Sequence, residues 1–376
     1  MSDTSTSGEL RRTALYDFHQ RHGARLVPFA GYELPVQYAG GIISEHLHTR
    51  SQAGLFDVSH MGQIRVEGAD AASALESLTP ADILCLAPGR QRYALLTNEA
   101  GGIVDDIMVI NTGNALLLVV NAACKERDLQ HLQDRIGARC GITPLFEERA
   151  LLALQGPAAV EVLGKLAPAV HESRFMEWRR IDLAGVECWI SRTGYTGEDG
   201  FEISIPSADA VRLAERLASD PAVQPVGLGA RDSLRLEAGL SLYGQDIDET
   251  TTPVPAGLGW TIGKPRRRDG ERAGGFPGAA RILEELEASR PEQTLVGLLP
   301  DGKAPVRAGA AVMDAAGNTV GRISSGGFSP SLNRPVAMGY VATAARTAGG
   351  LFAEVRNRRI SLQLTARPFV PHRYVR

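Results

Sequence analysis

The chain has 376 residues, of which 44% are hydrophobic and 22% charged, and its net charge is −3. This length predicts two or three domains rather than one core. The near-neutral charge does not favour a nucleic-acid partner, and no apolar run reaches the roughly 18 residues that span a bilayer. Residues 1–8 are polar and lack the apolar stretch of a secretory signal. We therefore expect a soluble, cytoplasmic globular protein with no membrane partner.

The first two thirds of the chain mix strand and helix patterns. Runs of apolar and β-branched residues between Asn- and Gly-rich turns predict strands, and apolar residues that recur every three or four positions predict helices. In chain order, the predicted elements are strands at 93–97, 103–110 and 116–121, a helix at 125–136, strands at 186–192 and 201–205 around a loop at 193–200, and a helix at 230–240.

The last third has a different pattern. Residues 264–278 contain a proline, a run of three arginines and a Gly-Gly pair, which is typical of a linker. A helix is predicted at 279–289, followed by short strands with turns at 300–304, 314–318 and 344–350. Regular short strands of this kind predict a small all-β barrel or sandwich.

Metal and nucleotide sites are not predicted. The spacing of His46, His48 and His60 matches no zinc motif. The sequence has no Walker loop, GxGxxG turn, GxSxG elbow or HExxH helix. The four cysteines are scattered without a CxxC pair, so we expect buried thiols rather than disulfides; they are Cys85, Cys124, Cys140 and Cys188.

Asp105 and Asp106 are the most informative pair in the sequence. In the predicted strand 103–110, alternation places Asp105 with Ile107 on one face and Asp106 with Met108 on the other. Whichever face packs in the core, one carboxylate lies among apolar side chains and must be hydrogen-bonded, protonated or turned toward a ligand. A carboxylate that caps neighbouring turn amides is the simpler alternative.

Three further polar positions each allow two interpretations. Glu202 lies opposite the apolar residues of its strand, where it faces either solvent or a ligand. The glycines of loop 193–200 permit positive φ and close backbone approach, which suits a ligand loop carrying Tyr195 or an ordinary long hairpin. Arg231 and Arg235, four residues apart on one helical face, either hold a carboxylate between them or lie on the exposed surface.

Six motifs in a fixed order make the chain resemble a known family. They are LFDVSHM at 55–61, GGIVDD at 101–106, LQGP at 154–157, GYTGEDGFE at 194–202, GARDSLRLE at 229–237 and LYG at 242–244. From about Thr13 to Val375, the sequence resembles the T protein of the glycine cleavage system, the aminomethyltransferase. It departs from the usual pattern at Gly31-Tyr32, where many relatives have Gly-Trp, and at 276–279, which lacks a basic residue.

The resemblance implies an α+β fold with three domains, arranged as a cloverleaf around a central folate channel. Residues 1–50 with 145–265 would form the first folate-site domain, 51–144 the second, 266–278 a linker and 279–376 a small C-terminal β-barrel. The implied reaction transfers the methylene of an aminomethyl group on the lipoylated H protein to tetrahydrofolate. Its products are 5,10-methylenetetrahydrofolate, ammonia and dihydrolipoyl H protein.

The resemblance also assigns roles to individual residues. Asp106 matches the family's key aspartate, expected to position N5 of the folate and to stabilise positive charge as ammonia leaves. Asp105 is a supporting carboxylate, and Glu202 matches the acidic residue that hydrogen-bonds the pterin ring. The other residues expected to line or support the folate pocket are Tyr93, Asn121, Tyr195, Arg231 and Tyr374.

Other folate-binding proteins on the same scaffold are the alternatives. The folate domains of dimethylglycine and sarcosine dehydrogenases belong to flavin enzymes, which need an additional nucleotide-binding domain; this chain lacks the room and the GxGxxG turn for one. A sulfoniopropionate demethylase is another relative. The tRNA-modification group, a non-transferase alternative, carries a Lys-Gly-Cys-Tyr-x-Gly-Gln type of signature that is absent here. A purely structural β-protein does not account for the ordered motifs.

Overall fold

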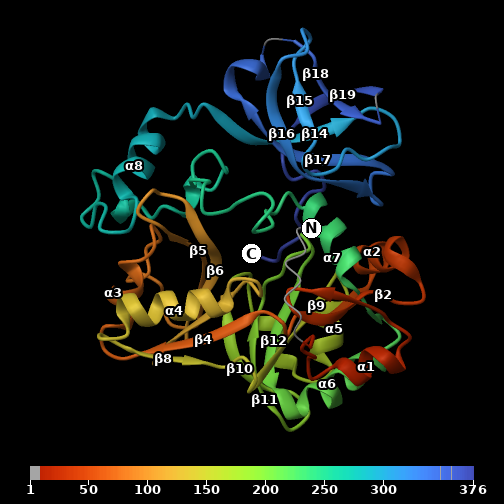
Figure 1. Cartoon of the computed structure of the whole chain (residues 1–376). Helices are drawn as coiled ribbons and strands as arrows, with labels where there is room; N and C mark the ends of the chain where they lie inside the picture. Colours follow the sequence, from red (N-terminus) through yellow and green to blue (C-terminus); the bar gives the residue numbers. More distant parts are fainter. Residues whose placement is uncertain (1–8, 348, 357) are drawn as a thin grey trace.

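The structure is a computed structural model that describes residues 9–347, 349–356 and 358–376. Figure 1 shows three parts: a five-stranded sheet with helix α4 (Lys125–Ile136) beside it, a six-stranded sheet with α6 (Ala210–Ala218) beside it, and a C-terminal barrel above both. The predicted α+β class and the C-terminal barrel are confirmed. None of the described helices is long and apolar enough to cross a membrane.

The five-stranded sheet has the strand order β5-β6-β7-β4-β8. One of its faces is apolar and packs against the amphipathic helix α4, which buries Leu132 and Ile136. The strands and the helix predicted for 93–136 are confirmed. The elements are β4 (Gly62–Glu67), α3 (Ala71–Glu76), β5 (Arg90–Thr97), β6 (Ile103–Asn111), β7 (Leu116–Val120), α4 and β8 (Gly141–Pro144).

The six-stranded sheet has the order β10-β11-β12-β9-β3-β13. Strand β3 belongs to this sheet, although it lies in the range 51–144 expected for the other domain; the proposed division at residue 50 stays a prediction. The strands are β3 (Ala53–Asp57), β9 (Arg149–Gln155), β10 (Trp178–Asp182), β11 (Glu187–Ser191), β12 (Gly200–Pro206) and β13 (Val223–Pro225). The other elements of this part are β1 (Arg25–Phe29), β2 (Tyr32–Gln37), α1 (Tyr16–Arg21), α2 (Gly41–Ser51), α5 (Ala159–Gly164), η1 (Pro168–Glu172), η2 (Ser207–Asp209), α6 and α7 (Leu228–Glu237).

The two sheets meet through their inner faces. Apolar residues of β6 and β7 pack against residues of β3 and β9 in one buried cluster, which contains Ile110, Val119, Phe56 and Ala153. The five-stranded sheet is therefore covered on both faces, by α4 on one side and by the second sheet on the other. This arrangement explains why strand β7 is apolar throughout.

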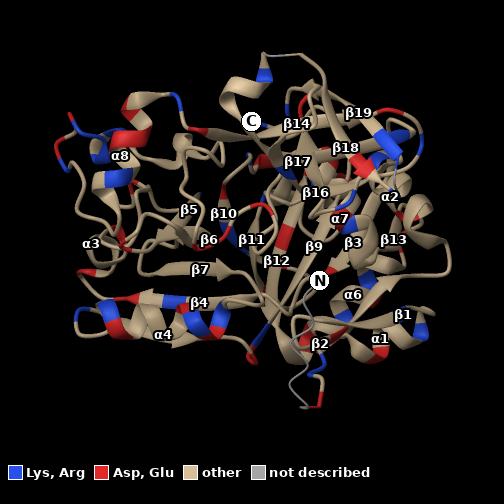
Figure 2. Cartoon of the chain, turned by 45° about the horizontal axis from the view of Figure 1, so that its top comes forward, with Lys and Arg blue, Asp and Glu red and all other residues tan. Residues whose placement is uncertain are grey.

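The segment between the sheets and the barrel is packed against the protein. Arg266 is buried and donates to the carboxylate and the carbonyl oxygen of Glu76 on α3, at 3.2 and 3.1 Å. Part of the segment predicted as a linker is thus packed against the five-stranded part of the protein. Its elements are η3 (Gly259–Thr261), η4 (Lys264–Arg266) and α8 (Ala279–Ala288). Figure 2 shows acidic and basic residues intermixed on α4 and α8, as the near-neutral net charge suggests.

The C-terminal barrel is closed, with the order β14-β17-β16-β15-β18-β19. Its strands contribute buried apolar residues to a separate core, and β14 and β17 are buried along most of their length. The elements are β14 (Gln293–Pro300), β15 (Ala311–Met313), β16 (Thr319–Ser329), β17 (Arg334–Ala342), η5 (Thr343–Arg346), β18 (Leu351–Val355) and β19 (Arg358–Thr365).

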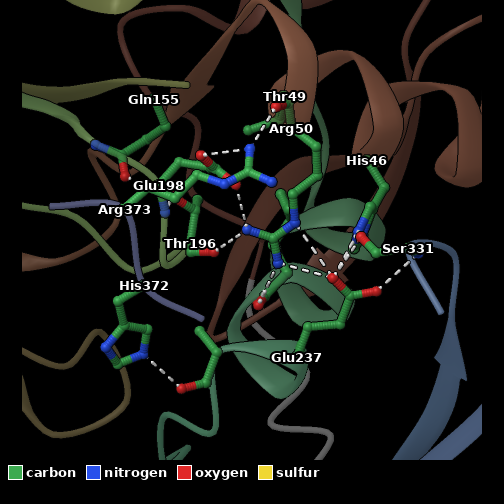
Figure 3. Close-up of polar contacts among 12 residues, drawn as sticks. His46, Thr49, Arg50, Gln155, Thr196, Glu198, Glu237, Ser331, His372 and Arg373 are labelled. Carbon is green, nitrogen blue, oxygen red and sulfur yellow. Dashed lines mark hydrogen bonds and ion pairs between the residues drawn. The ribbon is translucent and has the colours of Figure 1, made fainter. Parts of the chain in front are cut away.

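Buried charges join the barrel to the rest of the chain (Figure 3). Arg50 on α2 forms ion pairs with Glu198 and Glu237, at 2.9 and 2.8 Å, and His46 contacts Glu237 at 3.0 Å. Ser331, in the turn after β16, donates to Glu237 at 2.7 Å. Because Glu237 ends helix α7, this network fixes α7 between α2 and the barrel.

Candidate active site

Asp106 lies on the face of β6 that is turned toward the six-stranded sheet. It shares this face with Met108 and Ile110, which line a cavity between the two sheets. The hydroxyl of Tyr93 donates to Asp106 Oδ2 at 3.0 Å, and Asn121 Nδ2 donates to Asp106 Oδ1 at 2.8 Å. The side chain is therefore held at a fixed position beside the cavity.

Opposing effects determine the pKa of Asp106. Burial and the charge of neighbouring Asp105 raise its pKa, while the hydrogen bonds from Tyr93 and Asn121 lower it, and the result is a pKa of about 7. A carboxyl group with this pKa changes its charge near neutral pH, as an acid–base or electrostatic group of an active site does.

Asp105 lies on the opposite face of β6, toward α4, and is completely buried. Strand alternation thus separates the two carboxylates as the sequence predicts. The β5–β6 register shifts at Val104, just before the pair. Asn121 nevertheless contacts both carboxylates, because it directly follows the last residue of β7, the strand that pairs with β6. Its backbone N–H and its Nδ2 donate to Asp105 at 3.0 and 2.8 Å.

Glu202 faces the same cavity from the other sheet. Its position on β12 lies opposite Ser191 on β11 and Ala153 on β9, and Ser191 also lines the cavity. Burial raises the pKa of Glu202, and the charge of Arg231 opposes this effect. Glu202 thus faces the cavity, where its side chain is partly exposed, and its role in ligand binding stays a prediction.

Arg231 and Tyr195 form one wall near Glu202. The Arg231 guanidinium lies 4.7 Å from the centre of the Tyr195 ring, and Nη2 is 3.9 Å from the sulfur of Met61. Nη1 is buried and has no hydrogen-bond partner among the described residues. A buried guanidinium N–H without a partner costs free energy, so it indicates a position for a ligand acceptor.

The cavity itself is largely apolar, with a few polar side chains. Apolar walls with a few polar groups are the usual lining of a small-molecule site, although the free space in this cavity is narrow. The lining residues are Gln63, Gln91, Met108, Ile110, Leu117, Leu118, Val119, Leu151, Trp178, Trp189, Ser191, Glu202 and Ser204.

Two expected positions lie elsewhere. Arg235 does not share a ligand with Arg231: it is buried and pairs with Asp246 at 2.7 Å, which anchors α7 to the barrel side. The exposed-surface alternative is thus wrong for Arg235, which binds a protein carboxylate without Arg231. Tyr374 stacks on Phe175, with ring centres 4.1 Å apart. Its contact with a folate stays a prediction.

The histidines and cysteines do not converge. His46 belongs to the Glu237 network, His48 contacts the carbonyl of Ala222 at 3.0 Å, and His60 is buried near Phe29. Within the described ranges, no group of three His, Cys, Asp or Glu side chains is placed to hold a metal ion. The cysteines are free; Cys124, Cys140 and Cys188 are buried as predicted, whereas Cys85 is exposed, so the prediction of a buried thiol is wrong there.

Sequence reasoning missed two features of the site. Trp260 is 64% exposed and stacks on Tyr93 with ring centres 5.6 Å apart, so this pair links Asp106 to the molecular surface. Asp128, in the first turns of α4, is buried next to Asp105. The only available signal was an aspartate on the apolar side of a predicted helix.

A cavity between two sheets that Glu202 lines, with the titratable carboxyl of Asp106 held by two hydrogen bonds on the strand face that also carries lining residues, is typical of an enzyme that binds a small ligand with polar edges. Comparisons with known proteins identify the family. The model described as "GCVT N-terminal domain" matches residues 15–266, and "Glycine cleavage T-protein C-terminal barrel domain" matches 293–371. The chain belongs to the glycine cleavage T-protein family, the aminomethyltransferases.

Individual relatives agree with this assignment. The chain is 47% identical to the mitochondrial aminomethyltransferase of Homo sapiens, covering 97% of this chain and 91% of the human protein. It is 42% identical to the Dictyostelium discoideum enzyme, covering 98% and 95%. The crystal structure of aminomethyltransferase T from Bartonella henselae superposes with a TM-score of 0.91 at 43% identity, covering 98% of this chain and all of that one. The activity is that of an aminomethyltransferase of the glycine cleavage system.

Proposed function

We propose that the chain transfers the methylene of an aminomethyl group, carried on the lipoyl arm of the H protein, to tetrahydrofolate bound between the two sheets. The observation that supports this most directly is the placement of Asp106. Its carboxyl group is fixed by Tyr93 and Asn121 beside a cavity that Glu202 lines from the opposite sheet.

The side chains around the cavity offer the chemical groups that a folate ring needs. The edge of a pterin ring carries paired N–H donors, and the Glu202 carboxylate offers two acceptor oxygens in the wall of the cavity. Leu117, Val119 and Met108 offer apolar surface for the ring faces. The unpartnered Nη1 of Arg231 offers a buried donor for an acceptor atom of the ligand.

Tetrahydrofolate, when bound, supplies the nitrogens that accept the one-carbon unit. Asp106 is the proposed catalytic residue: its carboxylate holds the reacting nitrogen in position and stabilises the positive charge that develops as ammonia leaves. Tyr93 and Asn121 hold the Asp106 carboxyl group in one orientation. Asp105 supports the site from the other face of β6.

The H protein is the proposed donor partner. The family's place in the glycine cleavage system implies a lipoyl-bearing partner in general terms. The exposed Trp260, stacked on Tyr93, connects the surface to Asp106, so we place the path of the lipoyl arm past this pair.

We also retain the cytoplasm as the proposed location; the human and Dictyostelium relatives are named as mitochondrial proteins.

One reconstitution tests the proposal. The protein is mixed with aminomethyl-loaded H protein and tetrahydrofolate, and both ammonia and 5,10-methylenetetrahydrofolate are measured. The proposal requires equal amounts of the two products, and both must depend on tetrahydrofolate. Ammonia release at the same rate without tetrahydrofolate would contradict it.

A further inference from the structure

The part of strand β6 that carries Asp106 has a partner strand on one side only. Strand β5 pairs with β6 from Ile103 to Asn111, whereas β7 begins to pair with it at Met108. On the β7 side, residues 103–107 therefore lie beyond the paired region of the described sheet. Backbone carbonyl and N–H groups inside a protein need hydrogen-bond partners, so the groups that point to this side must be satisfied by other means.

Three side chains from other segments donate to carbonyl oxygens of this stretch. The donor and acceptor residues are Tyr243 with Ile103 at 3.2 Å, Arg127 with Val104 at 2.5 Å, and Asn121 with Asp106 at 3.1 Å. The N–H of Ile103 also donates, to the carbonyls of Asp248 and Thr251 in the loop that follows Tyr243. Side chains and a loop thus take the place of β7 along the strand that carries Asp106.

Arg127, in the first turn of helix α4, contacts the irregular point of this stretch. The pairing between β5 and β6 shifts its register between Ile103 and Asp105, so it passes over Val104. A bulge of this kind changes the direction of the side chains beside it, and Asp106 follows two residues later. The hydrogen bond from Arg127 to the carbonyl of Val104 holds the bulge in one conformation.

A surface ion pair does not account for the geometry of Arg127. Its Nη1 contacts the carboxylate of Glu249, but Nη2 donates to the carbonyl of Val104 and to the hydroxyl of Tyr243, the latter at 3.1 Å. That hydroxyl is the one that donates to Ile103. The contact with Glu249 by itself contributes little, because both side chains are about half exposed. The guanidinium therefore joins two of the three contacts that replace β7.

We propose that Arg127 is a positioning residue of the transfer reaction, which takes the place of strand β7 beside Val104 and so keeps Asp106 directed at the cavity. This inference rests on the proposed catalytic role of Asp106. Arg127 lies outside the cavity lining, so it acts through the backbone of β6. Displacement of a reacting group by about 1 Å can cost about 10²-fold in rate, so a contact of this kind affects turnover.

Steady-state kinetics and amide hydrogen exchange of Arg127→Met test the inference. Methionine keeps aliphatic bulk and removes the donors. We expect kcat to fall about ten-fold or more, with the KM for tetrahydrofolate within about two-fold of wild type, because the groups that bind the ligand remain. Exchange of the amides in residues 103–107 should become about ten-fold faster, since a hydrogen bond from a charged donor is lost.

Arg135→Met is the matched control. Arg135 lies on the same helix, has a half-exposed side chain and pairs with the carboxylate of Glu99 at 3.3 Å, so its contact is a surface ion pair. This variant should leave both kcat and the exchange of residues 103–107 unchanged. Tyr243→Phe removes the neighbouring donor and keeps the ring, and it should change kcat and exchange in the same direction as Arg127→Met. If Arg127→Met does not fold, Tyr243→Phe decides.

Three results would overturn the inference. Wild-type kcat and exchange in Arg127→Met would show that β6 does not depend on this contact. A raised KM with unchanged kcat would assign Arg127 to ligand binding instead. An equal loss of kcat in Arg135→Met would make the effect a general property of helix α4. Full activity of Asp106→Asn, measured in parallel, would instead show that the proposed role of Asp106 is wrong.

Discussion

Arg50 and Glu237 form a buried ion pair, 2.8 Å long, that joins helix α2 to the end of helix α7. The carboxylate of Glu237 also accepts hydrogen bonds from Ser329 and Ser331 at the end of barrel strand β16. One side chain therefore connects three segments that are far apart in the sequence. Helix α7 also carries Arg231, so the position of the cavity wall depends on this junction.

Replacement of Glu237 should destabilise the protein in a pH-dependent way. Although burial opposes ionisation, the contacts with His46, Ser329 and Arg50 lower the pKa of Glu237 to about 2. The stabilisation by its charge is therefore present above the ordinary pKa of 4.5 and is lost as the pH falls toward 2. Glu237→Gln should lower the free energy of unfolding by about 3 kcal/mol at pH 7.

Chemical unfolding at several pH values checks this prediction. The difference between wild type and Glu237→Gln should shrink as the pH falls below about 4.5. The exposed pair of Arg21 and Glu215 provides the control: Glu215→Gln should cost less than about 1 kcal/mol. An equal cost for Glu237→Gln at pH 3 and pH 7 would show that its charge does not stabilise the junction.

Gly102, which precedes β6, should tolerate no side chain. A Cβ atom at this position would lie 1.7 Å from the carbonyl oxygen of Glu249, which is backbone and cannot rotate away. The loop that accepts the Ile103 N–H would have to move, and with it the start of the Asp105–Asp106 strand. Gly102→Ala should cost about 2–4 kcal/mol of stability. Melting curves measure the effect, with Gly40→Ala as the control, because an added Cβ at Gly40 would have its nearest neighbouring atom 3.4 Å away. Equal melting temperatures for the two variants would refute the prediction.

Glu202 should contribute mainly to folate binding. A carboxylate that accepts ring N–H groups holds the substrate and the transition state alike. Glu202→Gln should weaken tetrahydrofolate affinity about ten-fold or more, since hydrogen bonds to charged groups are worth about 1.5–3 kcal/mol. Calorimetry measures the affinity, with Glu161→Gln on exposed α5 surface as the matched control. An affinity equal to that of the control would remove Glu202 from the proposed site.

Removal of the Asp105 charge should shift the pH profile of the enzyme. The charge of Asp105 is one cause of the raised pKa of Asp106, after burial. Activity that requires ionised Asp106 rises with pH through about 7 in the wild type. In Asp105→Asn, the midpoint should move to lower pH, which kcat measured from about pH 5 to 9 would reveal. A midpoint that moves upward or stays in place would contradict this coupling.

Local periodicity predicted part of the site, and tertiary packing determined the rest. Alternation within one strand is a local property, so it placed Asp105 and Asp106 on opposite faces of β6 correctly. The bridge through Asn121 could not be predicted in the same way, because it depends on where β7 ends relative to β6. That register is set by pairing between strands rather than by either sequence alone.

Helix α7 shows a second limit of prediction from sequence periodicity. Its period placed Arg231 and Arg235 on one face and suggested a shared ligand or a shared exposure to solvent. The helix instead packs against α2, β2 and the barrel strand β16. Arg235 therefore pairs with Asp246, whereas Arg231 turns toward Tyr195. An amphipathic pattern identifies one buried face and says little about a helix that is surrounded on several sides.

The most direct test of the central claim compares Asp106→Asn with Asp105→Asn by ammonia release from aminomethyl-loaded H protein, with melting curves alongside. Loss of one preorganised electrostatic group typically costs about 10²-fold or more in turnover. We expect that loss for Asp106→Asn, with tetrahydrofolate affinity much less affected because Glu202 and the apolar walls remain. Asp105→Asn should be milder and should lower mainly thermal stability. An inactive Asp105→Asn beside a nearly wild-type Asp106→Asn would contradict the account and exchange the roles of the two residues.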